Sequence, residues 1–213
     1  MGMTVNKTSA DLVTGFERRA RHGALPRSAA EREFGAEAVA ESVAGGELLE
    51  LWPGVLVLAS NAEEPLTRAS AALWRAGPQA VLSGLTAAAM HGCRAAAGRE
   101  IHVTVPYDCE RRSAPGLRVH QAWLRESDVL LLDGLRTFAL DVALTELLCS
   151  GPDRIALACL EQALHQLGGA AEEFRARLGV RLALRRDRRG TRRAAALLEL
   201  AWSRAPQLFP VPG

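Results

Sequence analysis

Several residue types and motifs are scarce or missing in this chain of 213 residues. Of its 26 lysine and arginine residues only Lys7 is a lysine, and aromatic residues make up 5% of the chain, so few rings are available to stack on bases. The four cysteines form no CxxC pair and fit neither a zinc knuckle nor a disulfide framework. Neither GxxxxGK[ST] nor GxGxxG is present, so no nucleotide-binding loop is predicted.

Long apolar runs are also missing. The N-terminal stretch MGMTVNKTSADLVTGFERRARHG has none, which predicts no signal peptide, and Asn6 stands where a myristoylation motif would carry serine or threonine. With unpaired cysteines, these features predict a cytoplasmic protein without a membrane segment. The apolar content of 48% is enough to bury a core of one or two domains.

Charge is distributed unevenly along the chain. Residues 1–60 carry six basic and eight acidic side chains, residues 61–150 carry nine and ten, and residues 151–213 carry eleven and six. The balances are −2, −1 and +5, so a polyanion is expected to meet the last third of the chain first.

The pattern of residues 8–60 predicts a winged helix-turn-helix domain. Apolar positions recur at helical spacing over 9–22, and two short helices over 28–34 and 36–44 meet at Gly35. Ser28 is predicted to cap the second helix in a capping box with Glu31. The segment ELLELWPGVLVLAS then predicts a β-hairpin, with a loop wider than two residues because Pro-Gly favours a type II turn.

Residues 65–205 predict an α+β domain with a small β-sheet and a helical C-terminal half. Helices are expected over 65–76, 83–91, 141–149, 152–167, 170–186 and 190–203. Strands are expected over 100–106 and 116–124, with one or two more around Asp133-Gly134. In the second strand, alternation places Trp123 on the inward face. The fold class predicted for the whole chain is therefore α+β, mostly helical after the winged domain.

Two groups of side chains are candidates for contacting DNA. In the helix-turn-helix, arginines at the end of the first helix and polar residues on the second could hold the phosphate backbone, although the recognition helix carries Glu37 and Glu41 and no basic residue. In the last third, nine arginines fall within 19 residues with one acid among them, and arginine suits phosphate because its planar fork can bond two oxygens. A solvated surface explains this second cluster about equally well, and no aromatics are interleaved with it in the sequence. The predicted DNA-binding residues are Arg18, Arg19, Arg21, Arg27, Ser28, Arg32, Arg185, Arg186, Arg188, Arg189, Arg192 and Arg193.

No constellation of residues predicts an enzyme. Ser83 and His91 lie about 12 Å apart along one predicted helix and cannot hydrogen-bond, so Ser83 is predicted to be a helix N-cap. His102 and His120 could share a face of two neighbouring strands, but no third ligand has a natural place, which favours solvated polar residues over a metal site. The sequence therefore predicts no catalytic residue, no metal and no cofactor.

The order of these features resembles the AbiEi-type antitoxins of type IV toxin–antitoxin systems. The resemblance rests on GGELLELWPGVLVLAS, ALWRAGPQAVLSGLTAAAMHGC, REIHVTVP, GLRVHQAWL and DGLRTFALDVALTELL, and covers most of residues 10–165. It implies a winged domain that binds promoter DNA and represses its own operon. It also implies that the following domain is needed to neutralise a nucleotidyltransferase-like toxin.

The chain departs from that family in three places. It ends at RAPQLFPVPG, where longer relatives continue into an endonuclease-like domain, so nuclease activity is not expected. Its recognition helix is acidic, and the family's arginine, threonine and aspartate are matched by Arg136, Thr137 and Asp141. The prediction is a DNA-binding transcriptional regulator of antitoxin type, with double-stranded DNA and a toxin as partners. The alternative is a protein-interaction module whose winged domain no longer reads DNA; the sequence leaves the oligomeric state open.

Overall fold

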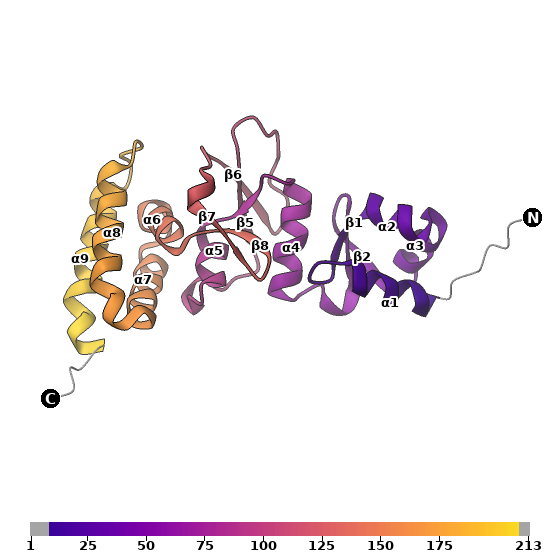
Figure 1. Ribbon diagram of the computed structural model, residues 1–213, viewed down its shortest axis with the longest axis horizontal. Coiled ribbons are helices and arrows are strands. Elements are labelled where there is room, and N and C mark those ends of the chain that lie inside the picture. The colour runs from indigo at the N-terminus through magenta and orange to yellow at the C-terminus, as the bar shows by residue number, and fades with distance from the viewer. Residues whose placement is uncertain (1–8, 209–213) are drawn as a thin grey trace, which may run out of the picture.

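The computed structural model of the protein describes residues 9–208, so residue 8, the first of the predicted winged domain, lies outside the described residues. Within that range the chain forms an elongated molecule, with the first helices at one end and the last helices at the other (Figure 1).

The N-terminal unit combines three helices with a three-stranded antiparallel sheet of order β1-β3-β2. Apolar side chains of all three helices meet the sheet in one cluster, in which Phe16, Val39, Leu48 and Leu56 are fully buried. The elements of this unit are α1 (Ser9–Arg19), β1 (Ala24–Pro26), α2 (Arg27–Phe34), α3 (Ala36–Ala44), β2 (Leu48–Trp52) and β3 (Val55–Leu58).

The hairpin β2–β3 differs from the prediction of a wide loop. Trp52 pairs directly with Val55, so the connection is the two residues Pro53-Gly54 alone. Gly54 has a φ of +83°, as the third residue of a type II turn requires. The strand register shifts between Glu50 and Trp52. This irregularity allows the strands to join through a type II turn, which does not match the twist of a regular two-residue hairpin.

The predicted cap of α2 is wrong. Pro26 occupies the N-cap position and no side chain caps the helix, while Ser28 lies one residue inside it. The proline ends β1, whose three residues are too few to produce a readable alternation, and the helix begins directly after it. Glu31 bonds Arg27 in place of Ser28.

The middle of the chain forms a five-stranded mixed sheet of order β6-β5-β4-β8-β7. β4 is parallel to β8 and antiparallel to β5, which in turn is parallel to β6. β4 was not predicted, because two residues carry no periodicity. The strands are β4 (Val81–Leu82), β5 (Ile101–Val105), β6 (Leu117–Gln121), β7 (Val129–Leu132) and β8 (Leu135–Phe138).

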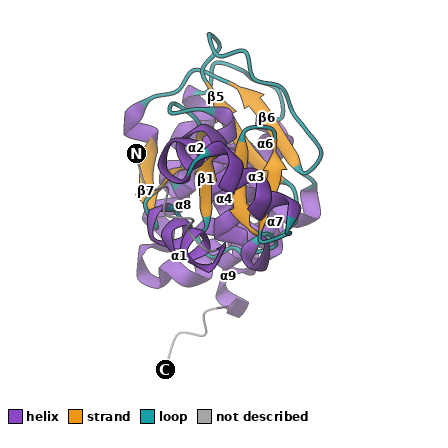
Figure 2. Ribbon diagram, turned by 90° about the vertical axis from the view of Figure 1, so that its right-hand side faces the viewer, coloured by secondary structure: helices purple, strands orange, loops and turns teal. Residues whose placement is uncertain are grey.

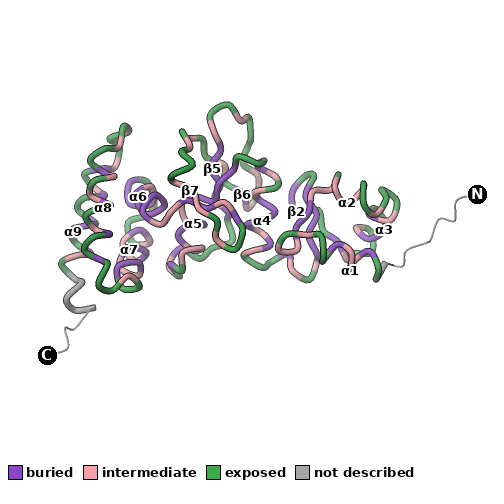
Figure 3. Tube along the Cα trace, in the orientation of Figure 1, coloured by how far each residue is buried: buried purple, intermediate pink, exposed green. Residues whose placement is uncertain are grey.

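Helix α4 (Pro65–Ala76) lies between the two sheets (Figures 1 and 2). It contacts β1 and β3 on one side and β5 and β8 on the other. Its alanines pack in a single apolar cluster with Trp52 and Val57 from the first sheet and Val103 from the second. The two sheets therefore share one continuous core, visible as the buried segments in the centre of Figure 3.

The opposite face of the five-stranded sheet and the C-terminal third of the described chain are helical. α5 (Gly84–Met90) covers the sheet, and the remaining helices pack on one another around a core that includes Leu144, Leu160 and Leu178. The predicted α+β class, with a mostly helical second part, is confirmed. These helices are α6 (Leu140–Ser150), α7 (Asp153–Leu167), α8 (Ala171–Leu184) and α9 (Thr191–Leu208).

Because Ala72 is fully buried where α4 meets both sheets, a larger side chain there has no room. We expect Ala72→Leu to lower the free energy of unfolding by about 1–3 kcal/mol through overpacking. Ala195→Leu, at an exposed position of α9, is the matched control and should change it by less than about 0.5 kcal/mol. Urea denaturation measures both, and equal effects would contradict the shared core.

Candidate nucleic-acid interface

The structure separates the two predicted groups of DNA-binding residues. The first group lies on α1, α2 and the segment between them, at one end of the molecule. The second lies in the arginine segment, residues 185–193, which joins α8 to α9 at the other end (Figure 1). The two groups therefore cannot form one compact site within a single copy of the chain.

Three arginines of the first group are bound within the protein. Arg19 pairs with Glu33 at 2.9 Å, and Arg21 donates to the carbonyl of Gly134 at 3.2 Å. Arg27 bridges Glu31 and Glu50, both at 2.8 Å, and these two carboxylates raise its pKa. Such pairing orders these side chains, and the carboxylates beside Arg19 and Arg27 reduce the positive charge that these two arginines offer to a phosphate.

The rest of the first group faces solvent. Arg18, Ser28 and Arg32 are exposed, and neither arginine has an ion pair with the described residues. Arg32 and Ser28 line a hollow of about 580 Å³ along α2, together with Arg19, Glu33 and Trp74. Its two arginines outnumber its one acid, so this hollow suits an anion such as a backbone phosphate.

The second helix of the helix pair presents acids. Glu37 and Glu41 are both exposed on α3. A glutamate can accept a hydrogen bond from cytosine but is repelled by phosphates. Its neighbours on the exposed surface of α3 include no arginine or lysine, as the sequence shows.

Several side chains of the arginine segment bind groups within the protein. Arg188 donates to the carbonyl of Ala183 at 2.8 Å and so caps α8. Arg189 pairs with Asp187, whose pKa falls to about 2 because of that bond. Arg193 bonds Asp153 and the carbonyl of Gly151, which fastens the start of α9 to α7.

Two exposed arginines of this segment, Arg186 and Arg192, have no ion pair with the described residues. Arg185 is half-buried and donates to the carbonyl of Asp187 at 2.9 Å. The segment is held close to α6 at Gly190, where a Cβ atom would lie 2.0 Å from the carbonyl oxygen of Cys149. Any side chain there would displace the whole segment.

Two further arginines of the cluster are structural. Arg181 on α8 bonds Asp141 at 2.5 Å and Asp128 at 3.0 Å, and thereby joins α8 to α6 and to the segment before β7. Arg175 pairs with Glu199 and lies over the ring of Trp202. Long-range pairs of this kind are not visible as a spacing in the sequence.

Ser83 stands at the N-cap position of α5 as predicted, but its hydroxyl does not cap the helix. Its oxygen is buried and has no hydrogen-bond partner. The carboxylate of Glu146 instead accepts a hydrogen bond from the amide of Gly84, while burial raises the pKa of Glu146 to about 7. The environment of Glu146 could not be predicted from the sequence, because it is built from distant segments.

His102 and His120 do meet on one face of β5 and β6, as the strand pattern predicted. Their rings stack, with Nδ1 of His102 3.2 Å from Nε2 of His120, and burial lowers the pKa of both. Among residues 9–208, no group of three histidine, cysteine, aspartate or glutamate side chains could hold a metal ion. The pair is a stacked contact, and a carboxylate oxygen of Glu100 lies 3.5 Å from Nε2 of His102.

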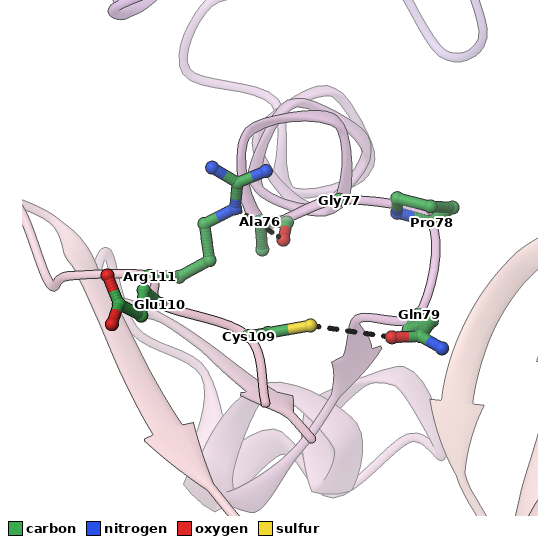
Figure 4. Close-up of a pocket in the computed structure, with 7 residues that line it drawn as sticks. All are labelled: Ala76, Gly77, Pro78, Gln79, Cys109, Glu110 and Arg111. Atoms are coloured by element: carbon green, nitrogen blue, oxygen red, sulfur yellow. Dashed lines mark hydrogen bonds between the residues drawn. The ribbon is translucent and has the colours of Figure 1, made fainter. Parts of the chain in front are cut away.

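A second hollow, of about 220 Å³, lies where α4 ends (Figure 4). Arg111 donates to the carbonyl of Ala76 at 3.1 Å, and the Cys109 thiol donates to Gln79 at 3.4 Å. These bonds fasten the loop after β5 to the end of α4. The hollow contains no acid–base pair suited to catalysis.

The position of Trp123 differs from the prediction. Trp123 was expected to point inward, but β6 ends at Gln121 and the alternation does not continue, which leaves Trp123 81% exposed. It contacts Tyr107, which is also exposed.

A family model described as the AbiEi antitoxin C-terminal domain matches residues 79–200, which is more than half of the chain. The chain belongs to the AbiEi antitoxin family. The match covers the five-stranded sheet from β4 onward and the helices through most of α9, so an AbiEi-type role in a toxin–antitoxin system follows for this chain.

The crystal structure of the RV2827C protein from Mycobacterium tuberculosis is similar to the AbiEi chain over nearly its full length. The likeness covers 95% of this chain and 80% of that one, with a TM-score of 0.61 and 17% sequence identity. At that identity it supports the fold alone. No curated protein matches the AbiEi chain. None of its described helices is long and apolar enough to cross a membrane.

The raised pKa of Glu146 predicts a pH-dependent stability. Between its ordinary pKa of about 4.5 and about 7, the unfolded chain has released the proton that the folded chain still holds, so stability falls as pH rises. Glu146→Gln removes this dependence. We expect the free energy of unfolding of the parent protein, relative to the variant, to drop by about 3 kcal/mol from pH 4.5 to pH 8. A constant difference in urea denaturation would contradict the burial of this carboxyl.

Proposed function

We propose that this AbiEi-family protein is a DNA-binding transcriptional regulator that represses its own operon. The proposal takes residues 8–60 as a winged helix-turn-helix domain and residues 65–205 as the antitoxin domain. The observation that carries it is the N-terminal unit, where α2 and α3 meet at Gly35 and are followed by the hairpin β2–β3, in the order of a winged helix-turn-helix.

In this arrangement α3 is the recognition helix and enters the major groove. Arg18, Arg32 and Ser28 are exposed beside it and would hold the backbone phosphates. Arg19, Arg21 and Arg27 would keep their internal partners and position the helices. Glu37 or Glu41 would accept from the amino group of cytosine, which would favour G·C pairs in the operator.

The arginine segment would supply a second contact with the same polyanion. Arg185, Arg186, Arg188, Arg189, Arg192 and Arg193 lie too far from α3 to touch the same groove in one copy (Figure 1). Charge reversal at Arg188, Arg189, Arg192 and Arg193 is therefore expected to weaken binding to all sequences about equally. Only Arg186 and Arg192 among the six combine full exposure with no internal ion pair or hydrogen bond in the described residues.

Fluorescence anisotropy with the duplex upstream of the gene and a shuffled duplex tests the proposal. The parent protein should bind the upstream duplex more tightly at two salt concentrations. Arg18→Gln combined with Arg32→Gln should lower the slope of log affinity against log salt by about 2, because each phosphate contact releases about one counterion. Arg154→Gln, an exposed arginine on α7, is the matched control.

Equal affinity for the two duplexes would contradict the proposal of sequence-specific regulation. If the double variant and the control both kept the salt slope of the parent protein, Arg18 and Arg32 would not contact the phosphate backbone.

The acidic surface of α3 favours a second candidate, a protein-interaction module that binds a toxin partner and not DNA. That partner would be a nucleotidyltransferase-like toxin, and both readings place the protein in the cytoplasm and give it no catalytic activity. Glu37→Gln with Glu41→Gln separates the two readings. If α3 lies in the groove, the loss of two negative charges should raise non-specific affinity for the shuffled duplex several-fold. If α3 binds a partner, the same variant should lose co-purification with the neighbouring toxin and leave duplex affinity unchanged.

A further inference from the structure

Two aromatic side chains stand in solvent at one edge of the five-stranded sheet. Trp123 is 81% exposed and Tyr107 is 54% exposed. Each follows the last residue of its strand by two positions, and β5 and β6 are parallel neighbours, so both rings emerge at the same edge. The ring centroids are 5.4 Å apart with the planes at 65°, an edge-to-face pair.

Backbone and side-chain bonds hold this pair in place. The amide of Ala122, next to Trp123, donates to the carbonyl of Val105 at 3.1 Å. The side chain of Gln121 donates to the carbonyl of Cys109 at 3.1 Å, which ties the end of β6 to the loop that carries Tyr107. The two rings therefore form a prearranged platform and not two independent surface residues.

One side chain of the arginine segment interacts electrostatically with this platform. Arg189 is 92% exposed, and its pKa is raised mainly by Asp187 with a smaller contribution from the Tyr107 phenol, so the two side chains lie within electrostatic range. In Figure 1 the loop between β5 and β6 and the turn between α8 and α9 both lie along the upper edge of the molecule. In the loop that carries Tyr107, Asp108 and Glu110 are matched in number by Arg111 and Arg112, so the arginine segment leaves the charge of the two segments together positive.

We infer that Tyr107, Trp123 and the arginine segment form a binding site for single-stranded nucleic acid. An unpaired base stacks on the exposed indole. Arg189, which stays 92% exposed although it pairs with Asp187, binds a neighbouring phosphate together with the exposed Arg186. Stacking on a protruding ring needs a free base face, which a duplex hides, so the ligand is single-stranded. Charge decides against a protein partner, because the rings are flanked by arginines, which complement a phosphate chain.

This site uses neither α3 nor the hollow beside α2, and it shares with the proposed regulator only Arg186 and Arg189 of the arginine segment. Tyr107 and Trp123 lie far from the arginine segment in the sequence, and the fold brings them closer to it. The ligand class is a DNA or RNA strand without a strong sequence preference, since every base presents a π face.

The test uses the full chain and fluorescently labelled twelve-nucleotide oligo(dT) and oligo(rU), followed by anisotropy. Trp123→Ala should weaken binding about 5- to 150-fold, the range for losing one base–aromatic stack. Trp123→Phe should restore most of it. Leu131→Ala, which removes an exposed apolar side chain on β7, is the control and should leave affinity unchanged. Arg186→Gln with Arg189→Gln should flatten the salt dependence, whereas Arg154→Gln should not.

Four results would overturn the inference. The first is no binding of either oligonucleotide by the parent protein. The second is equal loss in the Trp123→Ala and Leu131→Ala variants. The third is binding that depends on the arginines but not on Trp123, which would mean electrostatic contact without stacking. The fourth is loss of a co-purifying protein in Trp123→Ala without any oligonucleotide binding, which would make the platform a protein interface.

The failure of the two proposals can be told apart. Arg18→Gln with Arg32→Gln should weaken duplex binding and leave oligonucleotide binding intact. Trp123→Ala should do the reverse, so either site can be lost while the other stands.

Discussion

The packing of α4 between two sheets is the constraint on which the rest of the structure depends. Four of its residues, Ala69, Ala71, Ala72 and Ala76, are at most 4% exposed, and their small side chains let both sheets approach the helix closely. Separating the N-terminal unit from the middle of the chain would expose this apolar surface to water, at a cost of roughly 25 cal/mol per Å². The two parts therefore keep a defined relation, reinforced where Trp52 donates to the carbonyl of Pro115 and Arg21 to that of Gly134.

That relation sets what the arginines can do. Because the N-terminal helices and the arginine segment are at opposite ends of one elongated body, a single copy presents two separate basic surfaces and not one continuous stripe (Figure 1). Many of the arginines are used to build the body itself. Arg27, Arg181 and Arg193 each join two segments through carboxylates, and leaving the largely buried Asp141 without Arg181 would be costly. The exposed arginines without such partners are the ones open to a polyanion.

The sequence predicted most of the fold and little of the site. Most helices and strands longer than four residues were predicted within three residues of their ends, because periodicity follows burial, but α9 runs to Leu208 and not to residue 203. β1 and β4 were missed because two or three residues have no period, and the Ser28 cap failed because Pro26 ends a strand and starts the helix in one step. The internal partners of the arginines could not be predicted. Arg181, for example, bonds Asp128 and Asp141, which lie 53 and 40 residues away in the sequence. Trp123 was predicted to point inward because the alternation of apolar and polar residues does not show where a strand ends.

The central claim is that α2 and α3 bind duplex DNA while the helical end of the body does not read it. Amide hydrogen exchange, measured by mass spectrometry with and without the upstream duplex, tests this most directly. The account predicts new protection over residues 27–44, and none on the core-facing helix α7, which exchanges slowly in both states. Protection confined to the arginine segment, or unchanged exchange over 27–44 at saturating duplex, would contradict it.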